Sequence, residues 1–268
     1  LNFTELDCLY GQYLFRANLP VEANAQAQKL WLVGKSQPEA CDALFSQWQR
    51  SGGLTDELRW QRAKLAAEAG QYGLASSLIR QLPGLTHKGQ LLVEVAQKPQ
   101  LLKQTGKFVP ADRQMADVVG LGLRRMARQN PEQAIEWLEF YGNRLPFSSE
   151  EKVAIARSIG LTLAKRFDAR ALKVMAQYDP ELRDNTVSEW RTRLLLRLGR
   201  WNEAHELTLK LPQELASTPR WRYWQARSLQ LAQPQNPQPL TLYQPVARER
   251  DFYGFLSADR IQAPYQLK

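Results

Sequence analysis

Apolar residues recur along the chain at the three- and four-residue spacing of an amphipathic helix, without the sustained alternation of a strand. Residues 58–69 are rich in strong helix formers and end at Gly70, a residue suited to a helix C-terminus. Leu74, Leu78 and Leu82 form the apolar stripe of a second helix, which a Pro-Gly pair ends. This stretch predicts two short helices joined by a tight turn.

Similar helix boundaries recur roughly every ten to twenty residues along the sequence. Asp112 is a candidate N-cap for a helix that continues to about Arg128. Pro131 and Ser149 lie where the first turns of two further helices are expected, and the Asp179–Glu181 segment has the same character. The sequence therefore predicts an all-α fold made of short helices.

An internal repeat relates two distant stretches of the chain at one constant offset. Each stretch has the pattern of a helix, a glycine turn, a second helix with a small residue early in it, and Leu-Pro. This pattern is typical of TPR-like helical hairpins, and hairpins that stack only on their neighbours form a superhelical α-solenoid. Such a fold offers a concave face for binding or spacing. The matched positions are Leu65, Gly70, Ala75, Leu78, Leu82 and Pro83, and Leu194, Gly199, Ala204, Leu207, Leu211 and Pro212.

One proline-rich segment interrupts the helical pattern. Residues 233–239 contain three prolines among Gln and Asn residues, which predicts an exposed extended loop without helix. We therefore expect a superhelical helical-repeat domain over residues 1–232, a Pro/Gln-rich loop over residues 233–239, and the last helices with the start of a linker region over residues 240–268.

The chain carries 36 Lys and Arg against 27 Asp and Glu, so its formal net charge is +9. A basic surface favours anionic partners such as nucleic acid, acidic lipid or a carboxylate-bearing polymer, although a solvated surface with a modest basic bias explains the charge equally well. The basic residues are spread from Arg16 to Arg260, without a basic arm that has interleaved aromatics, so nucleic-acid binding is not expected. No apolar run approaches the about 20 residues of a membrane-spanning helix, so no transmembrane segment is expected.

The two cysteines, Cys8 and Cys41, lie in probable helices within one short part of the chain. They are either buried thiols or the two halves of a disulfide across a helical hairpin, and the residues alone leave both interpretations open.

Residues with catalytic or metal-binding potential do not form a recognisable site. His87 and His205 lack Cys or acidic neighbours at a ligand spacing, so no metal site is expected, and no glycine-rich phosphate loop or other cofactor motif occurs. The adjacent Glu150 and Glu151 lie at a probable helix start, where favourable interaction with the helix dipole explains them without an acid–base role. We expect no catalytic residue in this sequence.

Three stretches, in order along the chain, resemble motifs of the soluble lytic murein transglycosylases. Residues 30–48 resemble a signature of the N-terminal superhelical domain of that family, and residues 221–227 are similar to its WRYWxAR motif. Residues 250–260 look like the R-x-FYG-x-LAA-x-R block at the start of the linker region, with Ser257 in place of the first Ala. The motif positions that we expect to be structural are Trp221, Tyr223, Trp224, Phe252, Tyr253 and Gly254.

The resemblance implies a ring- or U-shaped scaffold in a periplasmic enzyme of Gram-negative bacteria. Members of the family carry a lysozyme-like catalytic domain that cuts the MurNAc–GlcNAc β-1,4 bond of peptidoglycan and leaves 1,6-anhydromuramyl ends. The Glu-Ser, Gly-Leu-Met-Gln and Ala-Tyr-Asn-Ala-Gly blocks of that domain do not occur in this sequence, so the chain alone is expected to be inactive. The implied partners are the catalytic domain of the same protein and peptidoglycan glycan strands. The oxidising compartment also favours a Cys8–Cys41 disulfide.

Two other functions fit a helical-repeat chain. A free-standing adaptor would bind a protein partner on its concave face. A helical-repeat nucleic-acid binder is favoured by the net charge alone.

Overall fold

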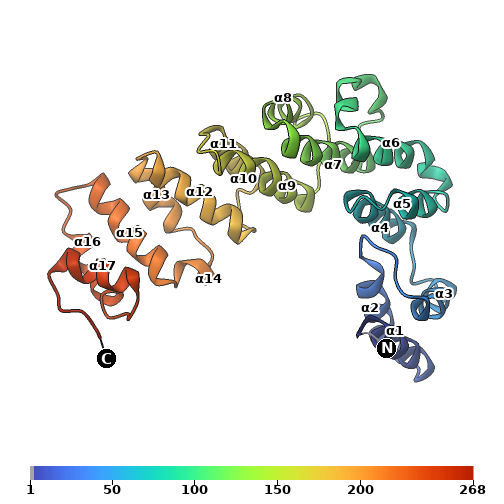
Figure 1. Ribbon diagram of the computed structural model, residues 1–268, viewed down its shortest axis with the longest axis horizontal. Coiled ribbons are helices and arrows are strands. Elements are labelled where there is room, and N and C mark those ends of the chain that lie inside the picture. Colours follow the sequence, from blue (N-terminus) through green and yellow to red (C-terminus); the bar gives the residue numbers. More distant parts are fainter. Residues whose placement is uncertain (1–2, 268) are drawn as a thin grey trace. The chain divides into compact units, whose positions relative to one another are not determined.

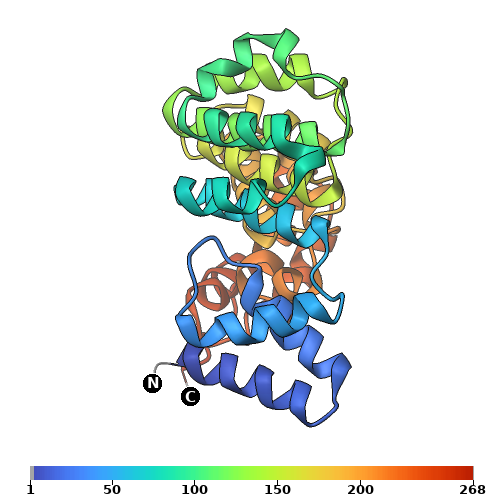
Figure 2. The ribbon, with the colours of Figure 1, turned by 90° about the vertical axis from the view of Figure 1, so that its right-hand side faces the viewer.

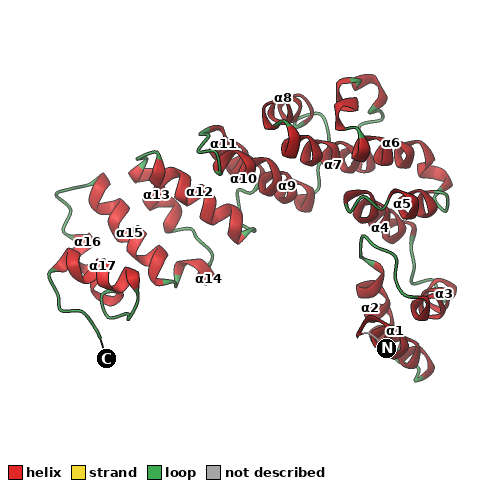
Figure 3. Cartoon of the chain, viewed as in Figure 1, coloured by secondary structure: helices red, strands yellow, loops and turns green. Residues whose placement is uncertain are grey.

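The computed structural model describes residues 3–267, and over that range it contains helices and turns but no strand (Figures 1 and 3). This confirms the all-α class. The described residues form two compact units, one of residues 3–126 with 136–148 and one of residues 127–135 with 149–267. Within the described range no helix is both long and apolar enough to cross a membrane.

In the N-terminal unit, helices that follow one another in the sequence pack against one another. Contacts join α1 to α2 and α3, α4 to α5, and α5 to α6, and Figure 2 shows these helices as successive layers. The helices of this unit are α1 (Phe3–Arg16), α2 (Pro20–Trp31), α3 (Asp42–Arg50), α4 (Asp56–Glu68), α5 (Tyr72–Ile79) and α6 (Thr86–Gln97), with most of α7 (Arg113–Gln129) and the second half of α8 (Pro131–Tyr141). Short 3₁₀ turns lie at Glu39–Cys41, Pro83–Leu85, Pro99–Lys103 and Thr105–Lys107.

Cys8 and Cys41 form a disulfide, with their Cα atoms 4.9 Å apart. Cys8 lies in α1, whereas Cys41 ends a 3₁₀ turn directly before α3, so the bond ties α1 to the start of α3. Both residues are fully buried. The disulfide therefore closes a loop that contains the second part of α1 and all of α2.

A buried polar cluster joins α4 to α7. The Trp60 Nε1–H donates to Asp117 Oδ2 at 2.7 Å, and Lys64 Nζ lies 2.6 Å from Asp117 Oδ1. Trp60 is 1% exposed and Asp117 is 5% exposed, so the indole and the ammonium group together satisfy a carboxylate that burial would otherwise penalise.

The two stretches of the repeat form the same turn in their separate units. Gly70 and Gly199 have φ values of +78° and +69°, a left-handed conformation that suits glycine. In each turn the residue after the glycine donates its backbone N–H to a carbonyl five residues earlier, from Gln71 to Ala66 and from Arg200 to Leu195. Ala75 and Ala204 are fully buried, and the leucines that follow them in the repeat are at most 6% exposed. The two helical hairpins expected from the repeat are therefore present. The matched positions Leu65 and Leu194 differ in burial, because Leu65 is 36% exposed and Leu194 only 1%.

In the C-terminal unit, contacts join α11 to α12, α12 to α13, α13 to α15, and α15 to both α16 and α17. The helices of this unit are α9 (Ser149–Ile155), α10 (Leu161–Ala164), α11 (Arg170–Tyr178), α12 (Asn185–Arg197), α13 (Trp201–Thr208), α14 (Gln213–Ala216), α15 (Pro219–Ala232), α16 (Gln238–Val246) and α17 (Phe252–Ile261). A π-helical segment, Ala156–Gly160, lies between α9 and α10.

Two expected boundaries differ from the structure. The Asp179–Glu181 segment is a turn rather than a helix start, because the buried Asp179 carboxylate accepts the backbone N–H groups of Arg183 and Asp184 and fixes a non-helical path. The Pro/Gln-rich loop is shorter than residues 233–239, because α16 already begins at Gln238. The Asn236 side chain accepts the Gln238 N–H at 2.9 Å, and proline is tolerated in a first helical turn.

The start of α11 gives a pH-dependent contribution to stability. Hydrogen bonds from the Arg170 side chain and backbone hold the pKa of Asp168 below its usual range. Its stabilisation is therefore complete above the unfolded-state pKa of about 3.9 and is lost as pH falls through the lower folded-state pKa. We expect Asp168→Asn to destabilise the protein at pH 7 by less than about 1 kcal/mol, because the pair is solvent-screened. Urea unfolding from pH 7 to pH 3 should show this difference shrinking, and a constant difference would contradict the assignment.

Candidate functional site

The aromatic residues of the two C-terminal motifs build the core between α15, α16 and α17. Tyr223 and Tyr243 are buried together, with ring centroids 5.7 Å apart, and Tyr253 lies 5.6 Å from Tyr223. Trp224 packs against the edge of this cluster, whereas Phe252 is 67% exposed. The motif residues are thus brought together from α15 and α17, and the exposed Phe252 lies outside the core.

Gly254 allows the first turn of α17 to approach the preceding backbone. A Cβ atom at this position would lie 1.9 Å from the carbonyl oxygen of Glu249 and 3.2 Å from that of Val246. The Gly254 N–H donates to Asp251 Oδ1 at 2.7 Å, which caps α17 at this close contact. The glycine therefore sets the position of Tyr253, its neighbour in the chain.

A groove of about 460 Å³ runs over the outer side of these motifs, and we call it the Arg–aromatic groove. α12 supplies two arginines and a leucine, α15 supplies one arginine and two tryptophans, and α17 supplies a tyrosine. The lining residues are Arg193, Leu196, Arg197, Arg220, Trp221, Trp224 and Tyr253.

Each arginine of this groove lies over an aromatic ring. The guanidinium carbons of Arg193, Arg197 and Arg220 lie 5.4, 5.0 and 5.8 Å from the ring centroids of Trp190, Phe167 and Tyr253, respectively. Phe167 has a positive φ of 59° in the turn that follows α10, and the residue is 55% exposed.

One carboxylate, that of Glu189, lies beside these arginines. It is 3.6 Å from the guanidinium nitrogens of both Arg193 and Arg220, and it accepts the Trp221 Nε1–H at 3.3 Å. Glu189 itself does not line the groove, and no acidic residue is among the lining residues within the described part of the chain. The groove therefore keeps an excess of positive charge.

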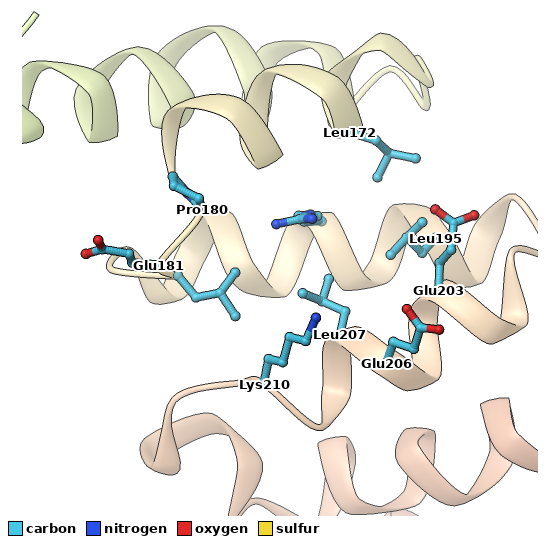
Figure 4. Close-up of a pocket in the computed structure, with 10 residues that line it drawn as sticks. Leu172, Pro180, Glu181, Leu195, Glu203, Glu206, Leu207 and Lys210 are labelled. Atoms are coloured by element: carbon cyan, nitrogen blue, oxygen red, sulfur yellow. The ribbon is translucent and has the colours of Figure 1, made fainter.

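A second pocket, of about 330 Å³, lies between α11, α12 and α13, and Figure 4 shows its lining residues. Glu203 and Glu206 extend from α13 toward the same side (Figure 4). Glu203 accepts two hydrogen bonds of 2.5 Å from Arg200, so both of its oxygens are already engaged. Burial lowers the pKa of Arg191 in this pocket, and the charges of Asp179 and Glu203 oppose that shift. This open, mixed-charge surface lacks a carboxylic acid enclosed in an apolar environment, which glycoside cleavage requires.

A third groove, of about 510 Å³, lies in the N-terminal unit, where residues 30–48 supply six of its thirteen lining residues. Arg62 crosses it, with its guanidinium carbon 4.2 Å from the Trp31 centroid and 5.4 Å from the Phe45 centroid. Burial lowers the pKa of Arg62 to about 10, an effect that Asp42 partly opposes. Arg62 is only 5% exposed, so it serves to close the Trp31–Phe45 layer rather than to contact a ligand.

The candidate metal and acid–base residues remain apart. The half-buried His205 has its Nδ1 atom 3.0 Å from the Gln225 carbonyl oxygen, and His87 lies in the first turn of α6. In residues 3–267 no cluster of three or more His, Cys, Asp or Glu side chains could hold a metal ion. Glu150 and Glu151 lie in the first turn of α9, the position at which a carboxylate interacts favourably with the helix dipole.

Sequence reasoning missed the arginines of the Arg–aromatic groove. Trp190, Arg193 and Arg197 share one face of α12 because they are separated by three and four residues. This spacing was a usable signal, but the partners on α15 and α17 become neighbours only in the folded unit.

Comparison with known proteins gives one partial and several extensive similarities. A profile of the cucumovirus coat protein family matches residues 12–103, about a third of the chain, and this short match supports no assignment. The soluble lytic murein transglycosylases of Escherichia coli K12 and Salmonella typhimurium are each 28% identical to the chain, over 268 and 271 residues. In both cases the match covers 99% of this chain and 41% of the relative.

Solved structures extend this similarity to the fold. The X-ray structure of an inactive variant of the lytic transglycosylase Slt from Pseudomonas aeruginosa is 66% identical, with a TM-score of 0.86 over 98% of this chain and 43% of that one. The 70 kDa soluble lytic transglycosylase from Escherichia coli is 26% identical, with a TM-score of 0.69 over 100% of this chain and 43% of that one.

The fold alone defines an all-α chain that contains helical hairpins of repeat type. The relatives define it more narrowly: the chain is homologous to the N-terminal region of the soluble lytic murein transglycosylases. It spans about two fifths of the length of those relatives.

Proposed function

We propose that this chain is the non-catalytic, superhelical scaffold of a periplasmic lytic transglycosylase. In this proposal it positions a catalytic domain of the same protein, which cleaves the MurNAc–GlcNAc β-1,4 bond of peptidoglycan to 1,6-anhydromuramyl products, and it contacts the glycan substrate. The similarity to the Pseudomonas aeruginosa enzyme, 66% identical over 98% of this chain, carries the proposal.

Features of the chain itself support this role. The glycine-turned hairpins and buried alanines of α4–α5 and α12–α13 are typical of solenoid scaffolds. The Cys8–Cys41 disulfide fits an oxidising compartment such as the periplasm.

The proposal is tested with the purified 268-residue chain and murein sacculi. We expect no 1,6-anhydromuramyl products by chromatography and mass spectrometry, but we expect the chain to pellet with sacculi at low salt. Because the net charge is +9, raising the ionic strength from about 0.01 M to 1 M should release it, since screening shortens from about 30 to 3 Å. Formation of anhydromuramyl products would contradict a non-catalytic role. Failure of the chain to pellet with sacculi at low salt would contradict its contact with the glycan substrate and favour a free-standing adaptor.

A further inference from the structure

We propose that the Arg–aromatic groove is a carboxylate-binding site that holds the peptide stems of murein. The proposal that the groove binds carboxylates rests on the geometry of α12, α15 and α17 alone. The choice of murein as the source of those carboxylates rests on the proposed function.

Charge is the first reason. The groove brings together the guanidinium groups of Arg193, Arg197 and Arg220, and among the described residues only the Glu189 carboxylate lies beside them. Three positive charges against one negative charge leave an excess of two. At 3.6 Å the contacts of Glu189 to Arg193 and Arg220 are too long for hydrogen bonds, so the guanidinium donors keep capacity for a ligand.

Orientation is the second reason. A guanidinium group that lies over an aromatic ring is restrained by the cation–π interaction, while its N–H edges remain available for pairing with a carboxylate. Arg193, Arg197 and Arg220 all have such a ring beneath them. The side chains of Arg193 and Arg220 are 39% and 43% exposed, so these edges are accessible. Less side-chain entropy is then lost when a carboxylate binds.

The position of Glu189 shows that a carboxylate fits between two of these side chains. It lies between Arg193 and Arg220 while it accepts the Trp221 indole N–H. Arg197 lines the same groove and has no carboxylate partner within residues 3–267, so its donors remain available to a ligand.

The walls of the groove suit the uncharged part of the ligand. Trp224 and Tyr253 are both half-buried and line the groove beside the arginines. Aromatic side chains of this kind offer flat apolar surface to aliphatic side chains and sugar faces. The groove volume of about 460 Å³ accommodates a short peptide segment.

The other two grooves do not share this character. The pocket in Figure 4 has Glu181, Glu203 and Glu206 against Arg191 and Lys210, so its charges do not favour an anion. In the N-terminal groove the single arginine, Arg62, is only 5% exposed. The Arg–aromatic groove is therefore the strongest candidate for anions among these three.

The test replaces the three arginines together, as Arg193→Gln, Arg197→Gln and Arg220→Gln. The matched control replaces three exposed arginines away from the groove, Arg16→Gln, Arg50→Gln and Arg128→Gln, and changes the net charge by the same amount. A third variant carries lysine at the three groove positions, which keeps the charge but removes bidentate pairing. Circular dichroism and thermal unfolding identify any variant that fails to fold.

Two probes are used with each variant. Murein sacculi are tested in native form and after carbodiimide-mediated amidation of their carboxyl groups, with pelleting as the measurement. Poly-L-glutamate is tested by the change in tryptophan fluorescence. We expect the groove glutamine variant to bind both probes at least about tenfold more weakly than the control variant, and the lysine variant to be intermediate. Amidation should weaken binding of the unaltered chain by a similar factor, which provides a test without mutation.

The outcomes separate the two proposals. Equal binding of sacculi by the groove and control variants, or no effect of amidation, overturns the groove as the stem site and leaves the proposed function intact. In another outcome, the groove variant loses binding to poly-L-glutamate, but neither the unaltered chain nor any variant binds sacculi. This result contradicts murein as the ligand and means that the groove binds another acidic partner. Tighter binding of a 20-nucleotide DNA than of poly-L-glutamate, by about tenfold or more, overturns the assignment to carboxylates in favour of phosphates.

Discussion

The double replacement Cys8→Ala and Cys41→Ala is expected to lower the unfolding free energy of the N-terminal unit by about 4 kcal/mol. The bond joins residues separated by 33 positions, and on the chain-entropy model a loop of this length restricts the unfolded state by about that amount. Because Cys8 and Cys41 are both fully buried, alanine also leaves small voids that add to the loss.

Native-state hydrogen exchange measures this effect locally, which matters because a chain with two compact units need not unfold in one step. Amides of α1, α2 and α3 should exchange faster in the double alanine variant, whereas those of α15–α17 should keep their protection. The unaltered chain after reduction by a phosphine is the control, since it retains both sulfur atoms. Unchanged protection in α1–α3 of both samples would contradict a stabilising role for the bond.

Signals that act over a few residues allowed much of the secondary structure to be predicted. The Asp112 side chain accepts the Met115 N–H at 3.0 Å at the start of α7, as expected of an N-cap. Asn130 likewise accepts the Gln133 N–H at 3.1 Å at the start of α8. Gly70 and Gly199 turn the chain where the repeat placed them. Each of these signals depends on one side chain and its own backbone, so the amino-acid sequence determines it directly.

Predictions failed where contacts in the folded chain determine the local path. Asp179 resembles an N-cap before Pro180, but its buried carboxylate accepts N–H groups four and five residues later and forms a turn. Leu65 has the spacing of a core residue, yet it is 36% exposed. Sequence spacing gives the face of a helix on which a residue lies, but the burial of that face depends on which neighbour covers it.

The Arg–aromatic groove was beyond sequence reasoning for the same reason. Its residues lie on α12, α15 and α17, which α13, α14 and α16 separate along the chain, and Trp221 and Trp224 were expected to be structural. Both tryptophans line the groove, but Trp221 fits that expectation at 2% exposure, whereas Trp224 is half-buried. One motif thus supplies both a core residue and a surface residue, which a sequence pattern does not distinguish.

Gly254→Ala is expected to destabilise the α15–α17 core by about 3 kcal/mol, the upper end of the usual cost of overpacking. The added Cβ would lie 1.9 Å from the Glu249 carbonyl oxygen. Because that atom belongs to the backbone, relief requires the first turn of α17 to move away from the turn that follows α16. The matched control is Gly73→Ala in α5, where a Cβ would meet no atom within 4 Å. There alanine should stabilise by about 0.5–1 kcal/mol through helix propensity.

Hydrogen exchange of the α17 amides and binding of poly-L-glutamate together test this prediction. Movement of α17 would displace Tyr253, which contacts both the Tyr223 ring and the Arg220 guanidinium group. The Gly254→Ala variant should therefore lose α17 protection and bind poly-L-glutamate more weakly, while Gly73→Ala changes neither. If the α17 amides of the Gly254→Ala variant keep the protection of the unaltered chain, the backbone accommodates the methyl group. That result would contradict the inference that Gly254 sets the position of Tyr253 in the groove.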